Sequence, residues 1–431
     1  MKIVGWTGRA LQGLRLLTGV AVLVGVGDAR SAEPGRKTYV IHISMDGFRP
    51  DAVTVLGPTN LPHFYRLRRE GAFTDNANSD YDITVTLPNH TCQLTGRGVM
   101  GPAGHNWSEN DDPLENQTLA SNKGSYIAGV FDVAHDAGLR TGFYASKSKF
   151  SLFINSWNET NGAPGGVGPN QGRNKIDVKV INETNTAELV SQLVADMDGE
   201  PFDYVFLHLM DPDAIGHSFG WDITPGSVYS DVAKAMDSRL GQILDLIDGN
   251  SRLSGQTAII ITADHGGGWF DHSIPTVPVN YTIPFYVWGP GVIAGADLYA
   301  LNPRNRLAPA GSRRPYSDPV QPIRNGEAAN TALRLLGLGP VPGSTINLAQ
   351  DLNLTAAPPP PDFRLILSPP QQFLQFTTFP RVHYDVQCSD QWQAGSWSNC
   401  VTDILGTGAV TNVNVGPSSG SSRFYRLKLH F

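Results

Sequence analysis

The sequence predicts an α/β fold in which a doubly wound, mostly parallel sheet lies between helices and is followed by a small all-β module. Short, continuous apolar runs rich in Val and Ile alternate with stretches of helical periodicity, which is the pattern of such a sheet. An Ala-Ala-Pro-Pro-Pro-Pro segment at residues 356–361 indicates a stiff linker. Beyond it, apolar and polar residues alternate singly, as expected of half-buried strands.

The sequence elements follow in chain order. Apolar runs predicted as strands buried on both faces of the sheet occupy residues 39–45, 204–210, 258–262 and 283–288, and a further strand is expected at residues 139–143. Helices are predicted at residues 127–137, along the apolar face made by Val232, Met236, Leu240, Ile243 and Ile247, and at residues 328–336. In the tail, the alternating positions are Val382, Tyr384, Val386, Cys388, Tyr425, Leu427, Leu429 and Phe431. We therefore predict a β module at residues 362–431; it contains no His/Asp cluster, so we assign it no chemistry.

Composition narrows the class of protein. The chain has 431 residues, of which 40% are hydrophobic and 16% charged, so a large core is possible and overall disorder is excluded. Its net charge of −7, without a block of Lys or Arg, argues against binding to a nucleic-acid duplex. Three cysteines are too few for a disulfide scaffold, although Cys388 and Cys400 are close enough in the tail to pair.

The N-terminus has the order of a secretory signal. Arg9 and Arg15 precede an apolar run at residues 16–26, and small residues follow. That run is shorter than the roughly 20 residues of a membrane-spanning helix, which disfavours the alternative of an uncleaved anchor. We therefore predict a signal peptide at residues 1–32, and a secreted or periplasmic protein with no membrane span in the mature chain.

Acidic and imidazole side chains follow the predicted strands. Taken singly, each has a plain structural explanation as a turn, a helix start or a capped loop. Together they form the inventory of a two-metal site, since His and carboxylate ligands suit zinc and the carboxyl ends of parallel strands meet at one edge of a sheet. The residues are Asp46, Asp213, His217, Asp264, His265 and His272. Asp213 and His217 are four positions apart, so one helical turn places both on the same face.

Thr86 is a candidate nucleophile. It directly precedes a probable helix, in which Pro88 is tolerated in the first turn. A hydroxyl at a helix N-terminus lies in a positive field, and metal coordination would lower its pKa further. The alternative is that Thr86 is a helix N-cap and nothing more.

Four motifs resemble the alkaline phosphatase superfamily and, within it, the type I phosphodiesterase/nucleotide pyrophosphatase branch. They are Ser-Met-Asp-Gly-Phe-Arg-Pro at residues 44–50, Thr-Leu-Pro-Asn-His at 86–90, Asp-Pro-Asp-Ala-Ile-Gly-His at 211–217 and Ala-Asp-His-Gly at 263–266. They occur in the family's order, and the resemblance covers residues 37–354. It implies an alkaline-phosphatase-like catalytic domain, which we place at residues 33–355.

The resemblance also implies the roles of individual residues. Two Zn²⁺ ions are expected per chain, one held by Asp213, His217 and His272, the other by Asp46, Asp264, His265 and Thr86. Thr86 would attack phosphorus and form a phospho-threonine that water then hydrolyses. His272 follows the Asp-His pair more closely than is usual in this branch, so His90 and His105 remain competitors for its role. Asn110, five residues after His105, is expected to donate to a phosphoryl oxygen, with Asn106 as the alternative.

The sequence does not decide which type of phosphate ester bond is cut. Lys147 and Lys149 are spaced like basic pairs that contact substrate in some monoesterases and phosphonate hydrolases of the superfamily, but they could equally be two solvated lysines. A sulfatase is disfavoured, because residues 86–89 lack the required Cys-x-Pro-x-Arg context.

The sequence thus predicts a secreted two-zinc hydrolase of phosphodiester or pyrophosphate bonds in small-molecule esters. The alternatives are a phosphomonoesterase or phosphonate hydrolase, and a secreted binding protein with a vestigial core whose C-terminal module contacts a surface, a glycan or sorting machinery.

Overall fold

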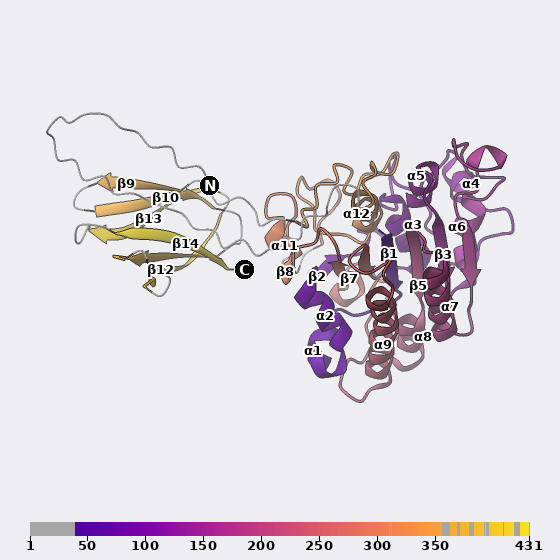
Figure 1. Ribbon diagram of the computed structural model, residues 1–431, viewed down its shortest axis with the longest axis horizontal. Helices are drawn as coiled ribbons and strands as arrows, with labels where there is room; N and C mark the ends of the chain where they lie inside the picture. The colour runs from indigo at the N-terminus through magenta and orange to yellow at the C-terminus, as the bar shows by residue number, and fades with distance from the viewer. Residues whose placement is uncertain are drawn as a thin grey trace. The chain divides into compact units, whose positions relative to one another are not determined.

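The computed structural model describes residues 39–309, 311, 313–355, 363–368, 371–378, 383–391, 393, 396–407, 409–417 and 423–430. The described residues belong to two compact units, a large unit up to residue 355 and a C-terminal module from residue 363 (Figure 1). The predicted signal peptide at residues 1–32 and the linker at 356–361 lie outside the described residues. Among the residues that are described, no helix combines the length and the apolar character needed to cross a membrane.

An eight-stranded sheet forms the centre of the large unit, with the order β4-β3-β5-β1-β6-β7-β2-β8. The strands are β1 (Tyr39–Met45), β2 (Ala72–Asn78), β3 (Thr141–Ala145), β4 (Val178–Ile181), β5 (Tyr204–Leu209), β6 (Thr257–Thr262), β7 (Thr282–Trp288) and β8 (Ala296–Asp297). Strands β4, β3, β5, β1 and β6 run parallel. Every residue of β1, β3, β5 and β6 is buried, which confirms the reading of continuous apolar runs as strands covered on both faces.

The direction of β7 differs from the expectation. Its apolar run was predicted as a parallel strand, whereas β7 pairs antiparallel with β6 and with β2. Only the short helix α10 (Pro278–Tyr281) lies between β6 and β7, whereas parallel neighbours are usually joined through a longer helix packed on the sheet. The central residues of β7 are buried, so its sequence pattern carries no information about strand direction.

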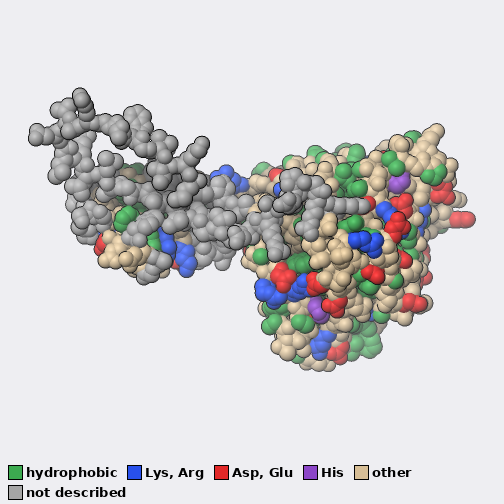
Figure 2. Space-filling model, in the orientation of Figure 1, with side chains coloured by type: hydrophobic (Ala, Val, Ile, Leu, Met, Phe, Trp, Pro, Cys, Tyr) green, Lys and Arg blue, Asp and Glu red, His purple; other side chains and the backbone are tan. Residues whose placement is uncertain are grey.

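Helices cover the two faces of this sheet (Figure 1). One layer contains α3 (Thr86–Thr95), α5 (Val130–Asp136) and α12 (Glu327–Leu335). The other contains α1 (Asp51–Asn60), α2 (Pro62–Glu70), α7 (Thr186–Gly199), α8 (Asp211–Phe219) and α9 (Val228–Gly249). Shorter helical segments are α4 (Leu119–Lys123), η1 (Ser148–Phe150), α6 (Ser151–Ser156), η2 (Asn170–Gly172) and α11 (Leu298–Leu301). This arrangement confirms the doubly wound α/β fold. The face of the large unit shown in Figure 2 carries acidic and basic side chains interspersed.

The C-terminal module consists of two antiparallel three-stranded sheets, ordered β13-β10-β9 and β12-β11-β14. The strands are β9 (Phe363–Ser368), β10 (Gln371–Thr377), β11 (His383–Ser389), β12 (Ser398–Leu405), β13 (Val410–Pro417) and β14 (Phe424–His430). Of the alternating positions, Tyr384, Val386 and Tyr425 are buried in its core, while Val382 and Phe431 lie outside the described residues. Cys388 and Cys400 form a disulfide.

Candidate active site

The predicted site residues lie at the carboxyl ends of four neighbouring strands. Asp46 follows β1 directly, and Lys147 lies two residues after β3. Helix α8 begins two residues after β5 and carries Asp213 and His217. Asp264 lies two residues after β6. Because β3, β5, β1 and β6 are adjacent in that order, their ends bring these side chains to one edge of the sheet.

Gly47 allows the carboxylates to approach one another. Its φ is +67°, and a Cβ at this position would lie 2.9 Å from the Cα of Asp213. Its backbone N–H donates to Asp264 Oδ1 at 3.0 Å. A glycine is therefore required by both the backbone conformation and the contact between the turn after β1 and the start of α8.

Asp213, His217 and His272 form one cluster of candidate metal ligands, which we name the open half of the site. Asp213 Oδ1 lies 3.3 Å from His217 Nε2 and 3.5 Å from His272 Nε2. The two Nε2 atoms are 3.1 Å apart. The structure thus brings His272 to the pair on α8. Of its competitors, His90 lies beside Asp264, and His105 lies 3.4 Å from the Sγ of the buried Cys92.

Asp46, Asp264 and His265 form a second cluster, which we name the buried half because all three side chains are fully buried. His265 Nε2 lies 3.0 Å from Asp264 Oδ2 and 3.4 Å from Asp46 Oδ1. It also lies 3.9 Å from Asp213 Oδ1, so the two halves are contiguous. Burial and the nearby Asp46 carboxylate raise the pKa of Asp264 to about 6. The carboxylates repel one another here, and a cation among them would relieve that repulsion.

The polar atoms that face this space lack hydrogen-bond partners. Among the described residues, the buried atoms without a partner include Asp46 Oδ1, Asp213 Oδ1, Asp264 Oδ2 and His265 Nε2. An unpaired buried polar atom is unfavourable, and four of them converging is the arrangement that a bound cation satisfies. Carboxylate oxygens and imidazole nitrogens are ligands that zinc accepts. The residues present therefore fit a metal centre.

The histidine tautomers support the same conclusion. In His217, His265 and His272, Nδ1 lies 2.8–3.0 Å from a backbone carbonyl, of Phe270, Gly266 and Thr84 respectively. A carbonyl only accepts, so each Nδ1 carries the proton. In the neutral ring, each Nε2 then presents a lone pair toward the carboxylates, as metal ligation requires. Backbone carbonyls that hold metal-binding imidazoles in this way are a usual feature of zinc sites.

Two further histidines lie at the site: His90, which the sequence offered only as a competitor for the role of His272, and His208, to which sequence reasoning assigned no place. His208 on β5 accepts a hydrogen bond from the backbone N–H of Ser146 and donates from Nε2 to Asp46 Oδ2 at 2.9 Å. His90 donates from Nδ1 to the Thr86 carbonyl at 2.8 Å and contacts Ser44 Oγ at 2.8 Å. Both nitrogens of each ring are engaged within the protein, so we read them as hydrogen-bonding supports. For His208, the signal in the sequence was a polar residue within an otherwise apolar strand, which indicates a buried hydrogen-bonding partner.

The two lysines after β3 lie in different places. Lys147 Nζ lies 2.6 Å from Asp46 Oδ2 and 2.7 Å from Asp213 Oδ2. Burial by itself would raise the pKa of Asp46, but Lys147 and the His208 hydrogen bond hold that pKa well below its usual range. Lys149 Nζ donates instead to the backbone carbonyl of Asn110.

Thr86 is the first residue of α3, and its side chain is buried. Asn110 lies next to it, because Asn110 Oδ1 accepts from the backbone N–H of Leu87 at 2.9 Å. Asn106, the alternative to Asn110, accepts instead from Lys123 through its Oδ1. The structure thus places the predicted nucleophile and the predicted amide donor side by side at the start of α3.

Comparison with known proteins identifies the family. The model of the type I phosphodiesterase/nucleotide pyrophosphatase family matches residues 40–310. The chain belongs to this family. Enzymes of this family are metal-dependent. Because the chain belongs to the family, it is a hydrolase of the alkaline phosphatase superfamily.

Solved structures show the same fold. Inactive murine ectonucleotide pyrophosphatase/phosphodiesterase 5, a threonine-to-alanine variant in complex with AMP, is 15% identical, with a TM-score of 0.51 over 73% of this chain and 99% of the murine one. The human protein is 16% identical, with a TM-score of 0.50 over 74% of this chain and 100% of its own.

An open cavity of about 580 Å³ begins beside the open half of this phosphodiesterase-family site. Trp221 and Phe270 line it, and each contacts His217: the Trp221 ring lies 5.1 Å from the His217 ring, and the Phe270 carbonyl accepts from it. The cavity also includes Trp269, whose side chain is 89% exposed and whose φ is +57°. Its volume is in the range of small-molecule sites.

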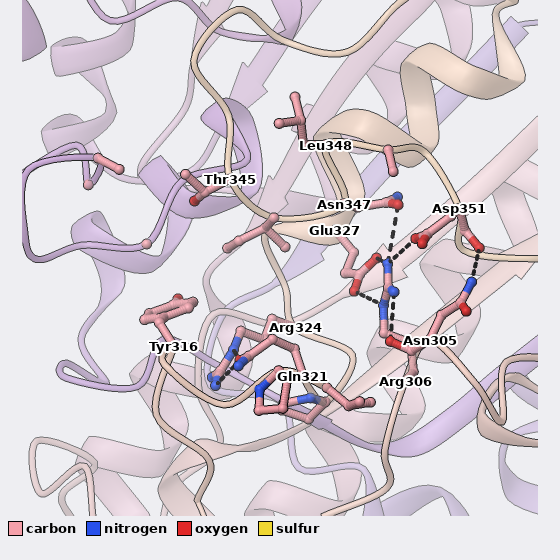
Figure 3. Close-up of a pocket in the computed structure, with 18 of the residues that line it drawn as sticks. Asn305, Arg306, Tyr316, Gln321, Arg324, Glu327, Thr345, Asn347, Leu348 and Asp351 are labelled. Carbon is pink, nitrogen blue, oxygen red and sulfur yellow. Dashed lines mark hydrogen bonds and ion pairs between the residues drawn. The ribbon is translucent and has the colours of Figure 1, made fainter.

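A second cavity, of about 550 Å³, shares no lining residue with either half of the site (Figure 3). Three of its charged groups, Arg306, Glu327 and Asp351, are paired with one another. Arg306 bonds to Glu327, Asp351 and Asn347, as the dashed lines in Figure 3 show. Arg324 is engaged by the carbonyl of Ser79. We therefore assign this cavity a structural ion-pair network and place the chemistry of the phosphodiesterase family at the strand ends.

Proposed function

We propose that this chain is an exported two-zinc hydrolase of phosphodiester or pyrophosphate bonds that acts through a phospho-threonine at Thr86. The observation that carries the proposal is the convergence of unpaired buried polar atoms from Asp46, Asp213, Asp264 and His265, with Asp264 lying 3.6 Å from His90 on α3. Asp213, His217 and His272 would hold one zinc, and Asp46, Asp264, His265 and Thr86 the other. When bound, the two ions supply Lewis-acid charge at the attacking and leaving oxygens.

The first step belongs to Thr86. Its Oγ attacks phosphorus in line, the bond from phosphorus to the leaving oxygen breaks, and the hydroxyl proton passes to solvent water. The position at the N-terminus of the ten-residue helix α3 favours the alkoxide, because the helix dipole is positive there. The inactive threonine-to-alanine variant of the murine relative accords with a threonine nucleophile.

Asn110 would hold a phosphoryl oxygen. Its Oδ1 is fixed by the Leu87 backbone N–H, which orients its amide NH₂ group away from that bond. A donor preorganised in this way stabilises the negative charge that develops on phosphorus oxygens. In the second step water displaces Thr86 Oγ, and two in-line displacements retain the configuration at phosphorus.

A second candidate activity is the hydrolysis of phosphomonoesters or phosphonates. It is favoured by Lys149, whose ammonium group contacts the carbonyl of Asn110 and so lies near the proposed phosphoryl site. A dianionic substrate gains more from such a cation than a diester monoanion does. Matched aryl mono- and diesters, measured with wild-type protein and Lys149→Met, separate the two activities.

Export is supported by the Cys388–Cys400 disulfide, which forms in oxidising compartments. We propose a secreted or periplasmic location on this ground together with the signal predicted at residues 1–32. Contacts of the C-terminal module with a surface, a glycan or sorting machinery stay a prediction.

Thr86→Ala tests the mechanism. We expect kcat on an aryl phosphodiester to fall by at least about 10³-fold, while about two zinc ions per chain remain bound by elemental analysis. Thr95→Ala in the last turn of the same helix is the matched control. It removes another buried threonine hydroxyl, which donates to the Thr91 carbonyl within the helix. Undiminished turnover by Thr86→Ala would discard the nucleophile assignment, and protein that binds no zinc would discard the metal centre.

A further inference from the structure

Lys147 lies between the two carboxylates that belong to different halves of the site. Its Nζ contacts Asp46 Oδ2 at 2.6 Å and Asp213 Oδ2 at 2.7 Å, and its side chain is 16% exposed. Two ammonium hydrogens are thus directed at two carboxylates that come from separate segments of the chain. The ammonium group and the two carboxylates form a largely buried triad of charges.

The two oxygens of each carboxylate face different partners. Asp46 Oδ1 and Asp213 Oδ1 have no hydrogen-bond partner and lie 3.4–3.9 Å from His265 Nε2. Asp46 Oδ2 accepts from Lys147 and His208, and Asp213 Oδ2 accepts from Lys147. Lys147 therefore binds the carboxylate oxygens that do not face His265 and leaves the oxygens that face His265 free for ligation.

We propose that Lys147 is a positioning residue that ties Asp46 to Asp213 and fixes the spacing of the two metal positions, rather than a contact to the substrate. The inference rests on the proposed two-metal function and assigns a part of that site. It separates Lys147 from Lys149, two residues along, whose ammonium group contacts a backbone carbonyl instead of a carboxylate.

The physical consequence concerns the protein before any substrate binds. Breaking a buried ion pair on one side leaves an uncompensated buried charge, which is strongly destabilising. Without Lys147, Asp213 Oδ2 loses its hydrogen-bond partner and Asp46 Oδ2 keeps only His208. The carboxylates are then free to rotate away from the metal positions, which weakens them as ligands. A lysine that only contacted substrate would have neither effect.

Lys147→Met tests the proposal, with Lys149→Met as the matched control. In excess chelator we expect the melting temperature of Lys147→Met to fall by about 5–10 °C. Its zinc dissociation constant, measured by competition with a chelating dye, should rise about 10–100-fold. Lys149→Met should match wild type in both measurements. Neither readout depends on catalysis, so a failure of the proposed phosphodiesterase activity is distinguished from a failure of this inference.

Substrate discrimination gives an independent readout. If Lys147 positions the carboxylates, Lys147→Met loses kcat/KM by the same factor on matched aryl mono- and diesters. If it contacted the substrate, the loss would be greater on the dianionic monoester. Should Lys147→Met not fold, Lys147→Gln keeps one donor for a carboxylate and should show the same changes at smaller size. Wild-type melting and zinc affinity in the lysine variants, with a loss confined to the monoester, would overturn the proposal.

Discussion

The two halves of the candidate metal site differ in how far water reaches them. In the buried half, the side chains of Asp46, Asp264 and His265 are all fully buried. In the open half, His217 is 45% exposed and borders an open cavity. The same ligand types therefore act in two environments, one set by the interior of the sheet and one by its rim.

The difference follows from the elements that carry each half. Asp46 and Asp264 continue directly from β1 and β6, the two paired strands at the centre of the sheet. His217 lies near the end of α8, and His272 in the loop before α10. Side chains at the ends of central strands are held by the sheet on both sides, whereas the end of α8 leaves His217 partly exposed. His272 is buried although it lies in a loop. We infer that the buried half is the more sensitive to substitution.

The largest expected effect comes from comparing His265→Ala with His217→Ala. Removing His265 leaves Asp46 and Asp264 facing each other in a space that water does not reach, so we expect at least about 100-fold weaker zinc binding and a loss of several kcal/mol of stability. Removing the half-exposed His217 lets water take its place, so zinc binding should weaken by only about tenfold. Zinc titration and urea denaturation of both variants measure the difference. Equal losses would show that burial does not distinguish the halves.

A carboxylate outside the site sharpens the comparison, because it is buried without a cation as close as Lys147 is to Asp46. Asp132 accepts hydrogen bonds from the Gly129 backbone N–H and the Tyr126 hydroxyl. Burial nevertheless raises its pKa to about 6 from an ordinary 3.8, opposite to the direction at Asp46. The cation beside Asp46 makes the difference.

The pH dependence of stability should report this raised pKa. The folded state binds the Asp132 proton more tightly than the unfolded state, so the contribution is present below about pH 4 and is lost as the pH rises through about 6. Relative to Asp132→Asn, wild type should lose about 2 kcal/mol between about pH 4.5 and about pH 7. Urea denaturation of both proteins at each pH gives the value as a double difference, in which other titrating groups cancel. A difference that is constant with pH would contradict the assignment.

The smallest expected effect is kinetic. A chelator should remove zinc in two phases of similar amplitude, with the faster phase at least about tenfold quicker, because water reaches the open half through the half-exposed His217 and does not reach the buried half. Release is followed with a zinc-sensitive dye. His217→Ala should abolish the fast phase and keep the slow one. A single phase in wild type would mean that the two positions release their metal together.

Local sequence patterns predicted much of the fold and part of the site. The continuous apolar runs located β1, β5, β6 and β7, and the spacing of Asp213 and His217 anticipated their place on one face of α8. The direction of β7 was not readable, because burial on both faces gives one pattern for parallel and antiparallel strands. The role of His208 was not predicted. His208 lies inside β5, and its contact with Asp46 exists only because β5 pairs with β1.

The sequence by itself determined which residue types are available for chemistry and which strand ends carry them, because the periodicity of burial is a local property of the chain. Only the tertiary structure decided which contacts each of these groups makes and how deeply it is buried. Whether Lys147 meets a carboxylate or the substrate, and how His217 and His272 are oriented, depend on contacts between residues more than 50 positions apart in the chain. Such contacts are set by packing and strand order, and spacing along the chain does not encode them.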